Sequence, residues 1–509
     1  MSKHKAPKGP RVATPAGPGS SRGGAGQVRA ESSQALAPLP VVETAGSSGP
    51  SSLAKRDEVR VAPTQTGQPW ENNPLYARTI RDIGRSCQKD QPLQAGDDRW
   101  EDFSQARGDR ATRKLLGMFC GKPQDQFLQV LFASHRGAGK TTELFRMQDA
   151  LKTQYRCLYL EANVQMDANR IEVEDLFVVL VQGIERFLRE AGTPLPEDRL
   201  ERVFKFFEQV TSTTLKGTDV SVEVETTGKA EGGLLWFAKF FGRVTGLFKA
   251  ESKHRDEIKS TLKKFPGTLL DSVNLLLDGA AQILAEDKKE LLIVIDNLDR
   301  YAPEVIDGLL VRNGDRIRQL RCNLLLTPPI GLLYRPHTQQ IDTHFPCEVM
   351  NTVRLRDPRQ PYESFEGPGR NALLAALAKR MDLDRLLPDE RARDRLVAVS
   401  GGAIRDLLDL VVNAALVADG QALSLADVEY AVQEKKQRLR DLCNANGFWD
   451  TLAAFAKEKQ IPPGDAKSLD VLYHRLVLKY NGQGWYDVVP MVAELPEFQH
   501  AQQKHSEPS

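Results

Sequence analysis

A short glycine-rich segment ends in a lysine and a hydroxyl residue, a combination suited to binding phosphate groups. Gly137 and Gly139 let backbone N–H groups turn toward an anion, and Lys140 adds a positive charge. The Thr141 hydroxyl is a suitable ligand for Mg²⁺. Ser134 stands where such a loop normally begins with glycine, and its small side chain still lets the loop close. The residues expected to contact the phosphates of a nucleotide are Ser134, Arg136, Gly137, Ala138, Gly139, Lys140, Thr141 and Thr142.

Acidic residues follow the apolar run 291–295, which is typical of a buried strand. Because ligands of open α/β sheets bind at the carboxyl ends of the strands, we expect Asp296 to hold Mg²⁺ together with Thr141. Many ATPases carry glutamate at the next position, where this chain has Asn297. An amide can position a water molecule but cannot accept its proton. We therefore expect slow hydrolysis, or the use of Asp299 as the base.

Two further polar residues are candidates for contacting the γ-phosphate. Thr327 follows the expected buried strand 321–326, although a strand ending in a proline-enforced turn explains it equally well. Arg405 follows two glycines at a helix start, where it could reach a phosphate from a neighbouring domain. The alternative is an ordinary arginine that pairs with Asp406 or Asp409. The predicted catalytic residues are Asp299, Asn297, Thr327 and Arg405.

Apolar runs separated by helical patterns predict the elements that position these residues. Five strands alternating with helices indicate an α/β fold with a parallel sheet. Helices are expected over residues 73–118, 173–191 and 260–284, and a long insertion over 193–265 contains an alternating strand pattern at 218–226. The expected strands are residues 127–133, 157–162, 290–295, 321–326 and 346–353.

The C-terminal third is expected to be helical and to end in a hairpin. Ser424 and Asp427 form a capping-box pattern that opens a helix to about Arg438. Two apolar runs flank an Asn-Gly turn at 481–482, which favours a hairpin. Helices expected at 449–458 and 466–475, followed by this hairpin over 476–489, suggest a winged-helix module.

Composition limits the kinds of protein this chain can be. It has 509 residues with a net charge of +1, so its overall charge indicates no polyanionic partner. Residues 1–72 are rich in Pro, Gly and Ser, and the first 69 contain no aromatic residue, which predicts a disordered leader. The six cysteines form no CxxC pair, and no apolar run is long enough for a transmembrane helix. Without a secretory signal pattern, a cytoplasmic location is expected.

Together these motifs resemble the AAA+ superfamily of P-loop ATPases, in particular its origin-recognition and STAND-like branch. The resemblance spans about residues 73–490 and extends to bacterial ATPases of conflict and defence loci, through the segments 135–144 (HRGAGKTTEL) and 400–408 (SGGAIRDLL). It implies a Walker A role for the lysine loop, a Walker B role for Asp296 and Asp299, sensor 1 at Thr327 and sensor 2 at Arg405.

The same resemblance implies a domain organisation. A P-loop ATPase core is expected over residues 73–360, a helical lid over 361–437 and a winged-helix-like domain over 438–509. The chain lacks the NKxD or TKxD segment that reads guanine in GTPases, so ATP is the expected nucleotide.

Three functions remain open at this point. The first is an ATP-driven conformational switch with weak turnover, with a bacterial defence role implied by the resemblance. The second is an ATP-regulated DNA-binding protein, although charges nearly balance over residues 465–475, so DNA is weakly supported as a partner. The third is a non-hydrolysing scaffold that holds its nucleotide. Besides ATP, the expected partners of this protein are further copies of the chain, as a homo-oligomer, or an effector protein. The apolar segment 234–248 could bind a partner, a membrane surface or another subunit, or it could pack against the strands of its own insertion.

The leader composition gives a first prediction. Deleting residues 1–69 should leave the melting temperature nearly unchanged, because this segment contributes no apolar core. Thermal unfolding of the full chain and of the truncated chain, followed by circular dichroism, measures the difference. A fall of more than a few degrees would show that the leader docks on the body of the protein.

Overall fold

The computed structural model describes residues 68–167, 169–214, 235–249, 253–334, 341, 344–360, 367–462, 467–481 and 484–506. Most of the predicted leader and the strand predicted at 218–226 lie outside these ranges. Residues 69–72, assigned to the leader from composition, form a 3₁₀ helix, η1 (Pro69–Asn72).

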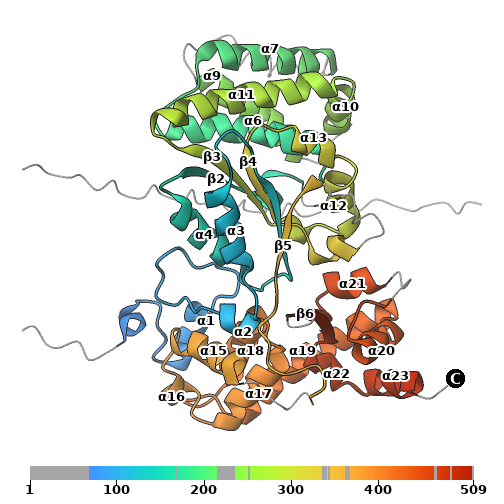
Figure 1. Ribbon diagram of the computed structural model, residues 1–509. Coiled ribbons are helices and arrows are strands. Elements are labelled where there is room, and N and C mark those ends of the chain that lie inside the picture. The colour runs from blue at the N-terminus through green and yellow to red at the C-terminus, as the bar shows by residue number, and fades with distance from the viewer. Residues whose placement is uncertain are drawn as a thin grey trace, which may run out of the picture. The chain divides into compact units, whose positions relative to one another are not determined.

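Five parallel strands form the central sheet of the described residues, in the order β2-β3-β4-β1-β5 (Figure 1). The parallel sheet predicted from the sequence is therefore confirmed, and the fold is of the α/β class. The P-loop strand β1 lies between β4 and β5, while β3 lies between β2 and β4. The strands are β1 (Gln129–Ser134), β2 (Tyr155–Glu161), β3 (Glu290–Asp296), β4 (Asn323–Leu326) and β5 (Cys347–Met350).

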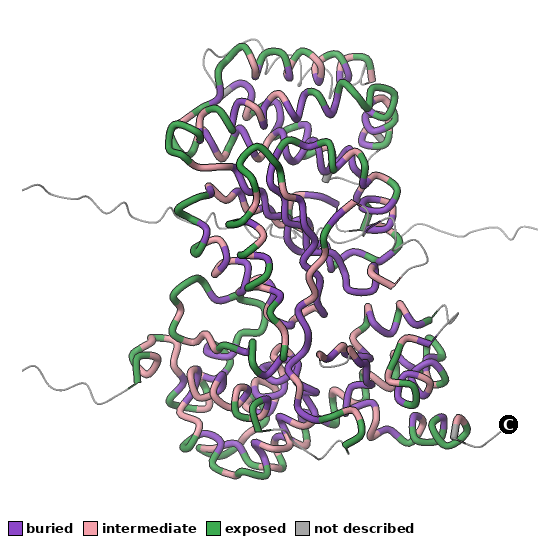
Figure 2. Tube along the Cα trace, in the orientation of Figure 1, coloured by how far each residue is buried: buried purple, intermediate pink, exposed green. Residues whose placement is uncertain are grey.

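Alternate residues of the buried strands face two separate hydrophobic clusters. On β3, Leu291, Ile293 and Ile295 belong to the cluster that includes α6 (Val173–Glu190) and α11 (Pro266–Glu286). Leu292 and Val294 belong to the opposite cluster, which includes α3 (Ala111–Gly121) and α4 (Lys140–Leu151). Because both faces are covered, the three central strands β1, β3 and β4 are buried along nearly their whole length, as Figure 2 shows for the middle of the sheet.

The remaining elements before the lid are short or belong to the insertion. They are α1 (Ile80–Ser86), α2 (Ser104–Arg107), α5 (Ala162–Gln165), α7 (Glu197–Thr214), α9 (Leu235–Lys249), α10 (Lys253–Leu262), η2 (Leu298–Arg300), α12 (Pro303–Leu310), α13 (Gly314–Arg318) and η3 (Ile330–Tyr334).

Two helix predictions were too long. The predicted helix over 73–118 is interrupted at residues 87–103, where the Asp97 and Asp102 carboxylates accept hydrogen bonds from backbone N–H groups two residues later. The predicted helix over 260–284 is two helices, because Pro266 opens α11 and cannot continue the preceding one.

The apolar insertion segment packs internally. In α9, Phe237, Phe240 and Phe241 are fully buried against the cluster that contains α6, and Figure 1 shows α6, α7, α9, α10 and α11 lying together. The described part of residues 234–248 therefore packs internally, but against helices, and the insertion strand expected as its partner lies outside the described residues. No helix among the described residues is long and apolar enough to cross a membrane.

The region predicted to be the lid forms a further hydrophobic cluster, separate from the two at the sheet, which also takes in the N-terminal segment 77–106. Ala77 bridges to Met381, and Cys87 and Phe103 are buried in the same cluster. The segment before the P-loop therefore packs with the lid, although the sequence grouped it with the core. The lid helices are α15 (Gly367–Ala378), α16 (Leu383–Leu386), α17 (Glu390–Ser400), α18 (Ile404–Val417) and α19 (Leu425–Asn446).

The capping box and the C-terminal hairpin are confirmed. Ser424 Oγ accepts a hydrogen bond from the Asp427 N–H, and α19 continues past Arg438 to Gly447, whose φ is 61°. The antiparallel β6 (Val477–Tyr480) and β7 (Trp485–Val488) form the hairpin. The helices around it are α20 (Trp449–Glu458), α21 (Ser468–Tyr473), α22 (Pro490–Ala493) and α23 (Pro496–Ser506).

Gly402 fixes the backbone conformation just before α18, the helix that contains Arg405. Its φ is 83°, and an added Cβ would lie 1.9 Å from the carbonyl oxygen of Val353. Both the backbone conformation and the closeness of that backbone atom exclude a side chain. The start of α18 is thus held against the segment that leaves β5.

We expect Gly402→Ala to lower the free energy of unfolding by about 2 kcal/mol or more, through a strained φ and a backbone clash. Urea unfolding measures the change. Gly420→Ala is the matched control, because Gly420 is exposed and its added Cβ would lie 3.4 Å from its nearest neighbour, the Ala422 carbonyl oxygen. The control should be within about 0.5 kcal/mol of wild type, and an equal effect of both changes would contradict this account.

Candidate functional site

The loop between β1 and α4 has the conformation that a phosphate-binding loop requires. Gly137 and Gly139 have φ values of 78° and 94°, and α4 begins directly at Lys140. Glycine adopts such positive φ values without steric cost, so the chain turns sharply and starts a helix at the end of β1. Ser134, the last residue of β1, is buried, and its Oγ donates to the carbonyl oxygen of His135 at 3.0 Å.

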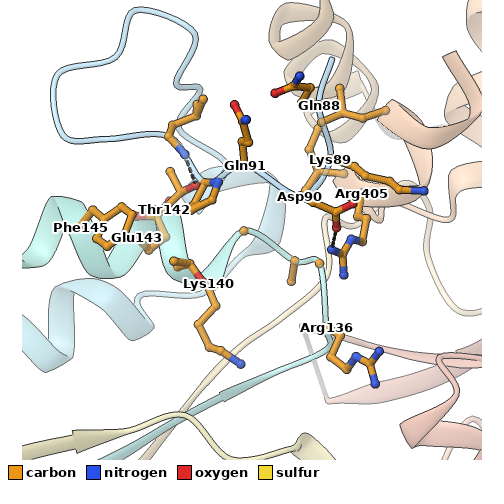
Figure 3. A pocket seen from close by; sticks show the side chains of 18 of the residues that line it. Gln88, Lys89, Asp90, Gln91, Arg136, Lys140, Thr142, Glu143, Phe145 and Arg405 are labelled. Carbon is orange, nitrogen blue, oxygen red and sulfur yellow. Dashed lines mark hydrogen bonds and ion pairs between the residues drawn. The ribbon is translucent and has the colours of Figure 1, made fainter. Parts of the chain in front are cut away.

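The lysine of this loop is buried and paired with an acid that follows β3, which is separated from β1 in the sheet by β4. Lys140 Nζ lies 2.6 Å from Asp299 Oδ2, and the two side chains are 5% and 9% exposed. Figure 3 shows the Lys140 side chain extending from the start of α4. Asp299 lies in η2, directly after β3, so the tertiary fold joins residues 159 positions apart.

The Asp296 carboxylate at the end of β3 collects hydrogen bonds from several elements. Its Oδ2 accepts from Thr141 Oγ1 at 2.6 Å and from the Tyr159 hydroxyl at 2.9 Å. Its Oδ1 accepts from Thr327 Oγ1 at 2.8 Å and from the Asn297 N–H at 2.7 Å. The structure thus brings Thr141 and Thr327 to the same acid, and the proline-turn alternative does not account for the Thr327 contact.

The surroundings of Asp296 keep it ionised. Burial alone would raise the pKa of this fully buried carboxyl, but the charge of Lys140 and the hydrogen bonds from Thr141 and Thr327 outweigh burial and lower the pKa. The acid is therefore a carboxylate near neutral pH, which is the form that binds a metal ion.

Asn297 contacts an acid that sequence reasoning missed. Its φ is 65°, and its side-chain Nδ2 donates to Glu161 Oε2 at 3.1 Å. Glu161 ends β2 and pairs in register with Asp296. The sequence did contain a signal for Glu161, which is a polar residue near the end of the strand predicted at 157–162. The carboxyl ends of parallel strands meet at one edge of the sheet, so such a residue is a candidate for the site.

Arg405 contacts the P-loop through its backbone and an acid through its side chain. Its N–H donates to the carbonyl oxygen of Gly137 at 3.3 Å, and its guanidinium pairs with Asp90 (Figure 3). A Cβ on Gly137 would come within 2.5 Å of the Arg405 side chain, so the two pack closely. The guanidinium therefore pairs with a different acid from the expected Asp406 or Asp409, both of which bond Lys435, and a contact of Arg405 with phosphate stays a prediction.

The C-terminal region also contacts the P-loop. Arg475 Nη1 donates to the carbonyl oxygen of Arg136 at 3.0 Å, and the Lys479 N–H donates to His135 Nε2 at 2.9 Å. The Arg136 guanidinium lies over the Tyr473 ring at 5.5 Å from its centroid. Arg475 has a φ of 59°, in the left-handed region that is costly for a residue with a Cβ atom.

A cavity of about 300 Å³ lies beside the loop, and Lys140, Thr141 and Thr142 are among the residues that line it. Sequence reasoning missed its opposite wall, which comes from the irregular segment 88–103. Figure 3 shows Gln88, Gln91 and neighbouring residues of this segment facing the start of α4. The segment is anchored there, because the Leu93 N–H donates to Thr142 Oγ1 at 3.1 Å.

A buried arginine holds the middle of the loop. Arg107 Nη2 donates to the carbonyl oxygen of Ala138 at 2.6 Å, and Arg107 Nη1 lies 3.8 Å from Glu143 Oε1. Burial raises the pKa of Glu143 more than the Arg107 charge lowers it. Arg107 was also missed from the sequence, since a lone arginine before the strand gives no signal.

The donor atoms at the end of β3 fit Mg²⁺. Thr141 and Asp296 present hard oxygen donors 2.6 Å apart, and Mg²⁺ typically takes one or two protein ligands while water and phosphate oxygens complete its shell. No group of three or more His, Cys, Asp or Glu residues that could form an all-protein metal site occurs in the described part of the chain.

Comparisons with known proteins give structural likeness only. No family model matches the chain, and a search of curated proteins found no match. Among solved structures, a Walker-type ATPase of Pyrococcus abyssi has 12% identity and a TM-score of 0.39, covering 81% of this chain and 98% of its own. Cdc6p from Pyrobaculum aerophilum has 13% identity and a TM-score of 0.36, covering 83% and 99%. The Aeropyrum pernix Orc1 protein in complex with DNA has 12% identity and a TM-score of 0.34, covering 82% and 95%. Because these TM-scores are below 0.5, we take the function from the site's own contacts.

His135 predicts a pH dependence of stability. Burial, followed by the charges of Arg475, Lys479 and Lys140, lowers its pKa from 6.5 to about 3. The unfolded chain therefore binds this proton more readily than the folded chain, and stability falls as pH drops below 6.5 toward 3. The slope should be at most about 1.4 kcal/mol per pH unit.

His135→Gln tests this prediction, because glutamine keeps an acceptor oxygen for the Lys479 N–H but does not titrate. Urea unfolding at pH 8 and pH 5 should show a larger loss of stability in wild type than in the variant. Equal losses would show that His135 is not the titrating group.

Proposed function

We propose that this protein binds ATP with Mg²⁺ at the P-loop, hydrolyses it slowly, and acts as a nucleotide-dependent conformational switch. One observation carries the proposal. The loop conformation brings Lys140 to Asp299 and Thr141 to Asp296 beside one cavity. A buried ammonium, turned backbone amides and a hydroxyl–carboxylate pair are the groups that phosphate and Mg²⁺ require.

Each group has a distinct role in this proposal. Lys140 would exchange its bond to Asp299 for one to a phosphate oxygen, since both acceptors carry negative charge. Thr141 and Asp296 would hold Mg²⁺, which supplies charge neutralisation at the phosphates. Thr327 remains on the Asp296 carboxylate and keeps its orientation fixed.

The cavity offers surfaces for a nucleobase as well as for phosphate groups. Most of its lining residues are polar or charged, but Leu93, Phe103 and Leu408 add apolar and aromatic side chains. Apolar surface beside a few polar groups is what a small-molecule site uses to hold a ring.

Contacts from outside the core support a switch. Arg405 from α18 and Arg475 from the segment after α21 both reach the P-loop, so the lid and the C-terminal region contact the residues that would hold the phosphates. Arg405 pairs with Asp90, and a γ-phosphate would compete for that guanidinium. A ligand shifts a conformational equilibrium only through such differential contacts.

The other proposed roles have less support. Tyr473 of α21 donates from its hydroxyl to the carbonyl oxygen of Arg300, so this short helix contacts the core, and no contact of the described residues favours DNA binding. A bacterial defence role and a homo-oligomeric or effector partner are supported by the family resemblance alone.

We expect calorimetry to show Mg²⁺-dependent ATP binding with a Kd in the micromolar range, and Lys140→Ala to weaken it at least tenfold through loss of a charge-assisted phosphate contact. Turnover should be below the ~10 s⁻¹ that is typical of enzymes. Lys152→Ala is the matched control, because Lys152 caps the other end of α4 and is exposed. A folded wild-type protein that fails to bind ATP would refute the proposal.

A further inference from the structure

We propose that Glu161 is the general base for ATP hydrolysis and that Asn297 positions it. This inference rests on the proposed ATPase function. It assigns the proton-accepting role to the end of β2, although the position after Asp296 is where an acid was expected.

The placement of Glu161 is the first observation. In the sheet its Cα pairs with that of Asp296, so the two acids end neighbouring parallel strands at the same edge. Glu161 lines the same cavity as Lys140 and Thr141. Its carboxylate is therefore on the side of the sheet where the phosphates are expected.

The partners of the cavity's carboxylates are the second observation. A general base must be free to accept a proton, and a carboxylate held by a cation is a poorer acceptor. Among the described acids that line the cavity, Glu161 bonds a neutral partner, the Asn297 amide. The other acids each lie on a cation: Asp299 on Lys140, Asp90 on Arg405, Glu143 on Arg107 and Glu101 on Lys379. Because bound ATP would draw Lys140 away from Asp299, Asp299 is the competing base, and the placement of Glu161 and its bond to Asn297 favour Glu161 over it.

The backbone at residue 297 explains why the acid is on β2. The φ of Asn297 is 65°, in the left-handed region that asparagine tolerates better than glutamate. The backbone conformation at position 297 therefore favours asparagine, whose side chain is a short amide. By donating to Glu161 Oε2, that amide orients the carboxylate of the adjacent strand.

The chemical step balances with water as the only co-reactant. As the water oxygen bonds to the γ-phosphorus, Glu161 accepts one of the water's protons. The bond between the γ-phosphorus and the β,γ-bridging oxygen breaks, and its electron pair leaves with ADP. The proton passes from Glu161 to solvent, which restores the carboxylate.

The test compares Glu161→Gln with wild type in the full-length protein, measuring ATP affinity by calorimetry and turnover by phosphate release. We expect kcat to fall about 100-fold or more, as is typical for loss of a general base, with the Kd for ATP within about threefold of wild type. Retained ATP binding also shows that the variant is folded. Glu161→Asp should recover part of the lost turnover. Glu197→Gln, an exposed residue at the start of α7, is the control and should match wild type.

The competing base is Asp299. If Glu161→Gln turns over like wild type while Asp299→Asn loses turnover at unchanged ATP affinity, the base is Asp299 and our assignment is wrong. If wild type does not bind ATP, the proposed function itself fails, which is a different result from normal binding with unchanged turnover in Glu161→Gln.

Asn297 is tested through a double-mutant cycle. Asn297→Ala should lower kcat with little change in ATP affinity, and it should cause no further loss in the Glu161→Gln background, because it acts through that carboxylate. If the two fold-losses in kcat multiply in the double variant, Asn297 acts independently of Glu161.

Discussion

A fully buried carboxylate, that of Asp296, is the constraint around which the site is built. A buried charge is tolerated only when it is hydrogen-bonded, and Asp296 finds donors on β2, on α4, after β4 and on the backbone of Asn297. These donors fix the distance between the start of α4 and the ends of three strands. Each carboxylate oxygen accepts from two of these donors, so the phosphate-binding loop and the sheet edge are positioned together.

The P-loop is also where distant parts of the chain meet. Its carbonyl oxygens at Arg136, Gly137 and Ala138 accept hydrogen bonds from Arg475, the Arg405 backbone and Arg107, respectively. A loop that turns its N–H groups toward a ligand leaves its carbonyl groups facing outward, and these must be satisfied by other elements. The positive φ values of the two glycines thus create both the ligand-facing side and the side to which the lid and the C-terminal region attach.

Sequence reasoning was most successful where a pattern is local. The apolar runs of the strands, the capping box at Ser424 and the hairpin after Leu476 were all recognised, because each depends on residues close in the chain. Two helix predictions were wrong in extent. The helix predicted over 73–118 is interrupted at residues 87–103, where several short-range signals compete, and the helix predicted over 260–284 is divided at Pro266. The roles of the individual site residues remain proposals, but the structure places the predicted acids and the lysine together.

The sequence by itself determined which groups are available: a glycine loop ending in Lys140 and Thr141, an acid after a buried strand, and an amide at position 297 where an acid was expected. These follow from residue type and short spacing. Only the tertiary structure decided which groups meet. Lys140 pairs with Asp299, Asn297 with Glu161 and Arg405 with Asp90, across separations of 159, 136 and 315 residues. Such pairs depend on strand order, register and the packing of the lid, and no local pattern encodes the distance between side chains brought together by the fold of the whole chain.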